Sequence, residues 1–175
     1  MTSVLKVDSI QTATGKPIVN ATGSVLQVVN YQFGSMLNLG NALFPYDDTI
    51  PQITEGGEVM TLAITPIAAT SKLIIDVLVN TSPGLSSEKQ VVALFQDTTA
   101  DALACVSEEC YDSAHMFAIP LKYFTSAAST SARTYKVRLG RTDSHSNVVT
   151  VNGYAGARKF GGVLATSITI TEIAG

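Results

Sequence analysis

The sequence has no tryptophan, only two cysteines and two histidines, and few charged side chains. Charged residues make up 14% of the 175 residues, against about 25% in typical soluble domains. No stretch reaches the roughly 18 consecutive apolar residues of a membrane-spanning helix, so we expect no membrane insertion. The net charge of −3 leaves no basic footprint, so we expect no nucleic-acid partner either.

Few charges are combined with many hydrophobic residues, which reach 46% of the chain at a mean hydropathy of +0.27. A lone domain of this size has a high ratio of surface to volume and must cover that surface with polar groups. The composition therefore favours a chain that buries part of its surface against other subunits. Lys6 and Asp8 interrupt the opening apolar residues, so the start is not predicted to be a signal peptide.

The motifs that mark common enzymes are missing. The sequence has no Gly-x-Ser-x-Gly elbow, phosphate-binding loop, dinucleotide fingerprint or His-Glu-x-x-His helix. Neither His115 nor His145 has a sequence context that specifies a Ser or Cys nucleophile. Acidic pairs such as Glu108 and Glu109 are expected in turns, where acidic residues are common. We predict no enzymatic activity and no cofactor.

Cys105, Cys110 and His115 recur at intervals of five. Zinc sites usually have two to four residues between their cysteines, so this spacing is a weak signal and we predict no metal site. A disulfide within the predicted loop at residues 101–113 is an alternative. A chain of this size has no need of such a cross-link, so we expect two reduced thiols.

Short runs rich in Val, Ile, Thr and Tyr recur between turn residues, and helical periodicity is almost absent. Lys72 begins a run that is apolar almost throughout, as in a strand covered on both faces, with Asp76 expected on the solvent side or facing a partner. Pro120 marks a bulge or an edge strand. The predicted strands are residues 24–32, 58–65, 72–80, 90–97, 114–124, 133–140, 147–152 and 163–173. Eight strands predict an all-β, antiparallel β-sandwich with jelly-roll topology.

Two connections are candidate contact surfaces. Residues 38–51 carry the apolar side chains Leu43, Phe44 and Tyr46, and residues 142–147 carry the polar side chains Asp143, His145 and Asn147. The first connection either folds over one end of the sandwich or contacts a partner. The second is either a solvated hairpin or a site for a receptor or glycan, since ligand contacts gather in loops.

Both ends of the sequence resemble virion proteins of tailed phages, especially phages of cyanobacteria and other aquatic bacteria. The opening LKVDSIQTATGKPIVNATGSVLQV matches an LKVD-x-IQ-x-x-x-G segment that precedes a β domain in those proteins. Residues 131–140 and 160–175 resemble the end of the same group. The resemblance implies a trimeric jelly roll on the virion surface or tail, of the tail-fibre or capsid-decoration type.

We divide the chain into an extended arm at residues 1–23 and a β-sandwich domain at residues 24–175. Fully extended, 23 residues span at most about 75 Å, enough to reach another virion protein. Leu5, Val7 and Ile10 can add a strand or fill a groove in that partner, while Ile18 and Val19 can pack around a threefold axis. The alternative is a disordered tail, which is common at chain ends.

Two virion functions remain open from the sequence. In the first, the chain is a short trimeric tail fibre, with the arm as anchor and the loops contacting the host. In the second, it is a decoration protein that clamps capsid subunits. A fibre requires its contact loops at the end away from the arm, whereas a clamp requires its apolar loops at the arm end. A carbohydrate-binding module outside any virion is a third, weaker alternative.

Overall fold

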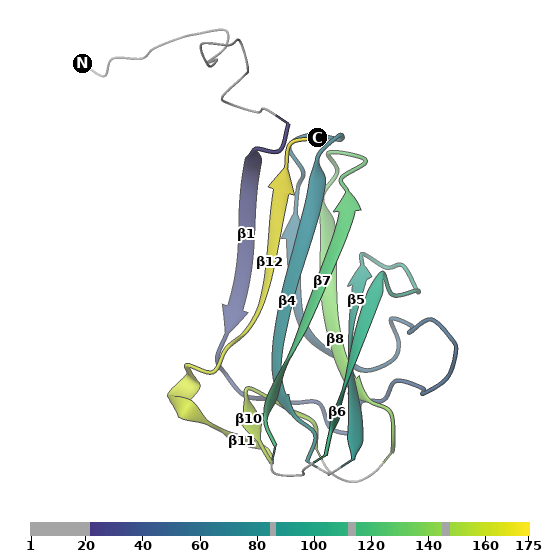
Figure 1. Ribbon diagram of the computed structural model, residues 1–175, viewed down its shortest axis with the longest axis vertical. Helices are drawn as coiled ribbons and strands as arrows, with labels where there is room; N and C mark the ends of the chain where they lie inside the picture. Colours follow the sequence, from purple (N-terminus) through teal and green to yellow (C-terminus); the bar gives the residue numbers. More distant parts are fainter. Residues whose placement is uncertain (1–21, 85–86, 112–114, 145–147) are drawn as a thin grey trace, which may run out of the picture.

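A computed structural model describes residues 22–84, 87–111, 115–144 and 148–175, which form a β-sandwich (Figure 1). The longer strands in these ranges are β1 (Val25–Phe33), β3 (Gly57–Ile64), β4 (Lys72–Ser82), β5 (Glu88–Gln96), β6 (Ala104–Cys110), β7 (Phe117–Ser126), β8 (Arg133–Arg141) and β12 (Thr166–Ile173). The shorter elements are β2 (Leu37–Asn38), β9 (Thr150–Val151), β10 (Gly153–Tyr154), β11 (Ala157–Arg158) and the 3-10 turn η1 (Phe160–Gly162).

The longer strands form two sheets, ordered β1-β12-β4-β7 and β3-β8-β5-β6, in which every neighbouring pair is antiparallel. Numbered one to eight along the described chain, these strands lie in the orders 1-8-3-6 and 2-7-4-5. This order defines a jelly roll, in which an antiparallel ribbon is wrapped into two packed sheets. The prediction of an antiparallel jelly-roll sandwich is confirmed.

The core lies between the two sheets, where alternate side chains of facing strands meet. Leu73, Ile75 and Val79 on β4 have no exposed surface, and neither do Val137 and Leu139 on β8. The side chains between them point outward, because successive residues of a strand face opposite sides of its sheet. Only the inner face of β4 is buried, and Leu78 on its outer face is 38% exposed, so the expectation of a strand covered on both faces is wrong.

Asp76 lies on the outer face of β4, and the Lys122 ammonium on β7 is 2.9 Å from its carboxylate. Both side chains are about half exposed, with relative exposures of 45% and 58%. The prediction of a partnered, solvent-side Asp76 is confirmed. Pro120 lies on β7, which pairs only with β4 within the described ranges, so the predicted edge position is also confirmed.

Three predictions of secondary structure are wrong: one strand was missed and two were placed incorrectly. Residues 104–110, expected within a loop, form β6, an edge strand whose Ser107 and Glu108 are exposed, so the sequence has no apolar run there. The strand expected at residues 147–152 reduces, in its described part, to the two residues of β9. The strand expected from residue 163 begins only at Thr166, because positive φ angles at Phe160, Gly161 and Gly162 turn the chain before it.

The described chain starts and finishes at the same end of the sandwich, which we call the arm end (Figure 1). There the Gly23 amide donates to the Ala174 carbonyl, and the Ala174 amide donates to the Ser24 carbonyl, both at 2.8 Å. The opposite end, which we call the far end, holds the connections β4–β5, β6–β7 and β8–β9. The two ends of the long axis therefore differ, with the start and finish of the described chain at one end only.

Glu172 on β12 ties the 67–71 connection to the arm end. Its buried carboxylate accepts hydrogen bonds from the Ile67 amide at 2.9 Å, the Ala68 amide at 3.2 Å, the Gln27 side-chain amide at 2.5 Å and the Ser71 hydroxyl. Burial raises the pKa of this carboxyl, but the hydrogen bonds from Ser71, Gln27 and the two backbone amides outweigh it and lower the pKa below the usual 4.5.

We expect Glu172→Gln to lower the free energy of unfolding at pH 7 by about 1.5–3 kcal/mol, the usual contribution of hydrogen bonds to a charged group. The neutral amide offers one acceptor oxygen to four donors and adds two N–H groups of its own. Because the folded-state pKa is lowered, the wild-type advantage should be full above pH 4.5 and should shrink as the pH falls below it.

Urea unfolding at pH 7 and at pH 3.5 measures this effect. The matched control is Glu58→Gln, since Glu58 is 47% exposed and its carboxylate lies 3.6 Å from the Arg138 guanidinium. An exposed pair of this kind contributes at most about 1 kcal/mol. Equal losses in the two variants at pH 7 would contradict the role given to Glu172.

Candidate functional site

The connection at residues 38–56 lies along the outer face of the β3-β8-β5-β6 sheet. It starts at the far end, where the Leu39 amide donates to the Val149 carbonyl at 3.0 Å. It then climbs to the β5–β6 turn, where the Ile53 amide donates to the Ala100 carbonyl at 2.8 Å. Residues 38–46 therefore belong to the far end, and residues 47–53 belong to one flank of the sandwich.

Phe44 anchors this connection and is not available for a surface contact. Its side chain is 1% exposed and packs with Val91, Ala93 and Phe95 of β5 in a second, smaller core. A Cβ atom on Gly140 would lie 2.7 Å from its ring, so only a glycine at that position leaves room for it. The interpretation of Phe44 as an exposed contact residue is wrong, because the sequence does not reveal the apolar outer face of β5.

Tyr46 and Asp143 remain exposed at the far end, and Tyr46 is 73% exposed. The Lys89 ammonium lies 5.2 Å from the centre of the Tyr46 ring. The two predicted loops meet here, since the Asn41 side-chain amide donates to the Ser144 hydroxyl at 3.2 Å. We call Asn41, Tyr46, Asp143 and Ser144 the far-end surface.

The structure places the other predicted site residues as follows. Leu43 is half-buried and bridges to Arg141 through its backbone. His145 and Asn147 lie outside the described residues, as do the arm residues Leu5, Val7, Ile10, Ile18 and Val19. Their proposed contacts stay predictions.

A buried pair of opposite charges lies beneath the far-end surface. The Arg141 Nε is 3.6 Å from the Glu88 carboxylate, and the two side chains are 0% and 2% exposed. The guanidinium also donates to the side-chain oxygen of Asn41 at 2.5 Å, which joins the pair to the loop above. Sequence analysis missed this pair, because Glu88 and Arg141 sit on different strands and each resembles an ordinary surface charge at a strand end.

Burial raises the pKa of the Glu88 carboxyl from 4.5 to about 7. The positive charge of Arg141 opposes this rise, and the negative charge of Asp143 adds to it. Glu88 therefore changes its charge near neutral pH. The Glu88–Arg141 pair therefore makes the charge of the far end depend on pH near neutrality.

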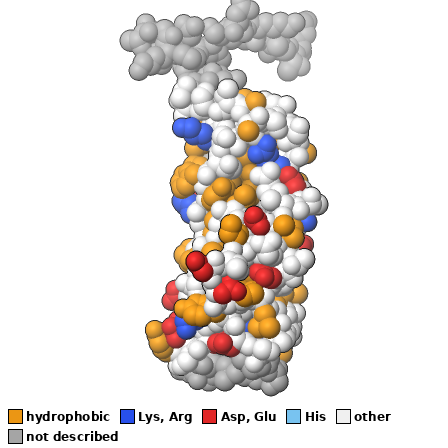
Figure 2. Space-filling view, turned by 90° about the vertical axis from the view of Figure 1, so that its right-hand side faces the viewer, with side chains coloured by type: hydrophobic (Ala, Val, Ile, Leu, Met, Phe, Trp, Pro, Cys, Tyr) orange, Lys and Arg blue, Asp and Glu red, His pale blue; other side chains and the backbone are white. Residues whose placement is uncertain are grey.

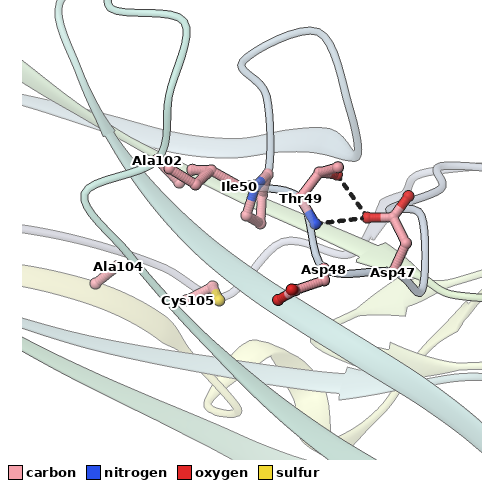
Figure 3. Close-up of a pocket in the computed structure, with 8 residues that line it drawn as sticks. Asp47, Asp48, Thr49, Ile50, Ala102, Ala104 and Cys105 are labelled. Carbon is pink, nitrogen blue, oxygen red and sulfur yellow. Dashed lines mark hydrogen bonds between the residues drawn. The ribbon is translucent and has the colours of Figure 1, made fainter.

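A cavity of about 280 Å³ opens on the flank of the sandwich, beside the β5–β6 turn and the start of β6 (Figure 3). It is lined by Asp47, Asp48, Thr49, Ile50, Pro51, Ala102, Ala104 and Cys105. The Asp47 carboxylate accepts from the Thr49 hydroxyl at 2.5 Å and from the Thr49 amide at 2.9 Å, and these hydrogen bonds lower its pKa. Asp48 has no such bond to Thr49 and points across the cavity (Figure 3). We call this cavity the flank pocket.

Cys105 and Cys110 are not joined by a disulfide, as predicted. Both lie on β6, and five residues along one strand separate their Cα atoms by about 16 Å, well beyond the reach of a disulfide. In the described ranges no three His, Cys, Asp or Glu side chains gather as a metal site would require. No helix in those ranges is long and apolar enough to cross a bilayer.

Comparison with known proteins adds little about function. No protein-family model matches the sequence, and a search of curated proteins finds no match. Among solved structures, the chain is similar to that of the infectious bursal disease virus Gx strain, with 10% identity, a TM-score of 0.38 and 99% of this chain covered. It is also similar to the VP2 subviral particle of that virus, with 10% identity, a TM-score of 0.35 and 95% covered. The chain spans 41% and 43% of those chains.

We expect the stability of the domain to fall as the pH rises from about 4.5 to 7 and to level off above pH 7, because Glu88 binds its proton more tightly in the folded state. The slope contributed by one such group is at most about 1.4 kcal/mol per pH unit. Glu88→Gln, which stays neutral, should flatten this window. Urea unfolding at half-unit pH steps measures both curves.

The matched control is Glu109→Gln, since Glu109 is about one third exposed and its carboxylate lies 3.6 Å from the Lys89 ammonium. This variant should keep the wild-type slope. An unchanged slope in Glu88→Gln would show that the pH dependence arises elsewhere.

Proposed function

We propose that the chain is a virion protein of a tailed phage, a short trimeric tail fibre. Its N-terminal arm attaches it to the virion, and its far-end surface contacts the host. The jelly-roll topology is compatible with this function, since jelly rolls recur in viral capsid proteins, but they also form lectins and cupins. The fold alone therefore does not decide the function.

The polarity of the domain is the observation that carries the proposal. The described chain enters β1 at the arm end, where Gly23 is bonded to Ala174. The exposed Tyr46 and Asp143 lie at the opposite end, where the Asn41 side-chain amide donates to the Ser144 hydroxyl and Lys89 lies over the Tyr46 ring. A fibre requires this separation of anchor and contact loops. A capsid clamp would need its apolar loops at the arm end. The arm end exposes Ile67 at 57%, whereas the far end exposes the larger Tyr46 at 73%, and this difference favours the fibre.

Exposed apolar side chains support the part of the proposal that concerns self-association. Val28 on β1 is 56% exposed, while Phe160 and Val163 reach 70% and 85%. We infer that these side chains contact other subunits, as exposed apolar patches on soluble proteins commonly do. They agree with the low charge of the sequence.

Deletion of residues 1–21 tests the anchor. We expect the truncated chain to keep its thermal midpoint, because the deletion leaves the Gly23 and Ser24 hydrogen bonds in place. The truncated chain should not attach to virions from which this protein is missing, whereas the full-length chain should attach to them. Normal attachment of the truncated chain would overturn the role of the arm.

Tyr46→Ser on assembled particles tests the far-end surface. We expect adsorption to host cells to slow by roughly tenfold or more, as for an exposed aromatic at the centre of a contact. The matched control is Phe124→Ser, an aromatic of similar exposure that lies near the arm end, opposite Ile74. Slower adsorption for Phe124→Ser and not for Tyr46→Ser would place the host contact elsewhere.

A further inference from the structure

A short knob, residues 158–163, projects beside the far end at the lower left of Figure 1. Arg158 and Lys159 are exposed on it, and Phe160 and Val163 are 70% and 85% exposed. Phe160 has a φ of 50°, in the left-handed region that an aromatic residue rarely adopts. Such a conformation costs about 1–3 kcal/mol, although this side chain gains little burial within its own domain.

The Phe33–Ser35 segment packs against the knob. It is itself fixed by the Asn152 side-chain amide, which donates to the Phe33 carbonyl at 2.9 Å and to the Ser35 carbonyl at 3.2 Å. Gly34 lies so close to the knob that a Cβ atom there would come within 1.8 Å of the Gly162 carbonyl oxygen. The Phe160 ring lines a cavity with Phe117 and Leu164 of its own domain and still leaves 70% of its surface exposed. A largely exposed ring next to a backbone positioned by Gly34 is the arrangement expected of a preformed contact residue.

The flank pocket is complementary to the knob, since it combines an apolar lining with negative charge. Ile50, Pro51, Ala102 and Ala104 give it an apolar lining, and Asp47 and Asp48 bring two negative charges. Figure 2 looks at this flank and shows acidic and hydrophobic side chains interspersed over the lower half of the molecule. The pocket lining contains two carboxylates and no cation, whereas residues 153–165 contain two cations and no carboxylate.

We infer that the knob of one copy docks into the flank pocket of the next copy. The Phe160 ring enters the 280 Å³ cavity, while Arg158 and Lys159 face Asp47 and Asp48 around its mouth. A buried aromatic anchor surrounded by polar and charged contacts is the usual anatomy of a protein interface. This contact deepens the self-association in the proposed function and rests on that part of it.

The contact joins two different surfaces of the chain, because the knob and the 38–56 connection, which supplies part of the pocket lining, lie on opposite sides in Figure 1. Such heterologous contacts repeat from copy to copy and close into a ring when the rotation between copies allows it. A second copy fits the pocket better than a small ligand does, because the same chain carries a rigid projection of the opposite charge.

Charge reversal tests the contact in the full-length chain. We expect Lys159→Glu and Asp48→Lys each to raise the concentration of half-dissociation by about tenfold or more, since each places like charges together. The double variant restores opposite charges and should recover most of the wild-type association. Asp48 is chosen because Asp47 also bonds Thr49 within the loop. Sedimentation velocity over a range of concentrations measures all four chains.

Phe160→Gly separates the contact from folding. Glycine relieves the positive φ, so the thermal midpoint of the monomer should stay or rise. Loss of the ring should weaken association by roughly 10- to 100-fold, the usual effect of exposing a large apolar side chain. An oligomeric wild type whose association is unchanged in Lys159→Glu and Phe160→Gly would overturn the contact alone. A wild type that stays monomeric would overturn self-association as well.

Discussion

The insertion of β12 between β1 and β4 holds the rest of the structure in place. Thr171 lies opposite Val28 on one side and opposite Ile74 on the other, so the last strand joins the first and third long strands of the described chain. The pairing brings Gly23 to Ala174 and places both ends of the described chain at the arm end. Because all neighbouring strands are antiparallel, the exposed loops 38–46 and 142–144 are then placed at the far end.

Two buried carboxylates, one at each end of the domain, have pKa values shifted in opposite directions. Glu172 at the arm end is surrounded by hydrogen-bond donors that favour its charged form and lower its pKa. Glu88 at the far end is buried beside Arg141, and there burial dominates and raises the pKa. Protonation of Glu88 in mild acid therefore increases the stability of the fold, whereas protonation of Glu172 in stronger acid decreases it. The domain responds to pH differently at the end where it would be anchored and at the end where it would meet the host.

Much of the fold could be predicted from the sequence, because a strand that turns one face to the core between the two sheets needs apolar residues at alternate positions. Leu73, Ile75 and Val77 made β4 recognisable in this way. The edge strand β6 was not, since main-chain hydrogen bonds to β5 hold it while Ser107 and Glu108 remain exposed.

The candidate site was less predictable, because it depends on contacts between distant residues. Phe44 looked exposed in the sequence, although it packs under its own loop against β5. The pairing of Glu88 with Arg141 depends on how β5 aligns with β8, and residue types alone do not give this register. The sequence also gives no sign of the knob at residues 158–163, since only the backbone reveals its positive φ angles and its close contact with Gly34.

The central claim is that the chain is a tail component of a virion, anchored at one end and making contacts at the other. The number of copies per purified virion, measured by quantitative mass spectrometry against the major capsid protein, tests this claim most directly. The account predicts a small fraction of the number of capsid subunits. A number comparable to that of the capsid protein would contradict the fibre and make the chain a decoration protein, and complete absence from virions would contradict both.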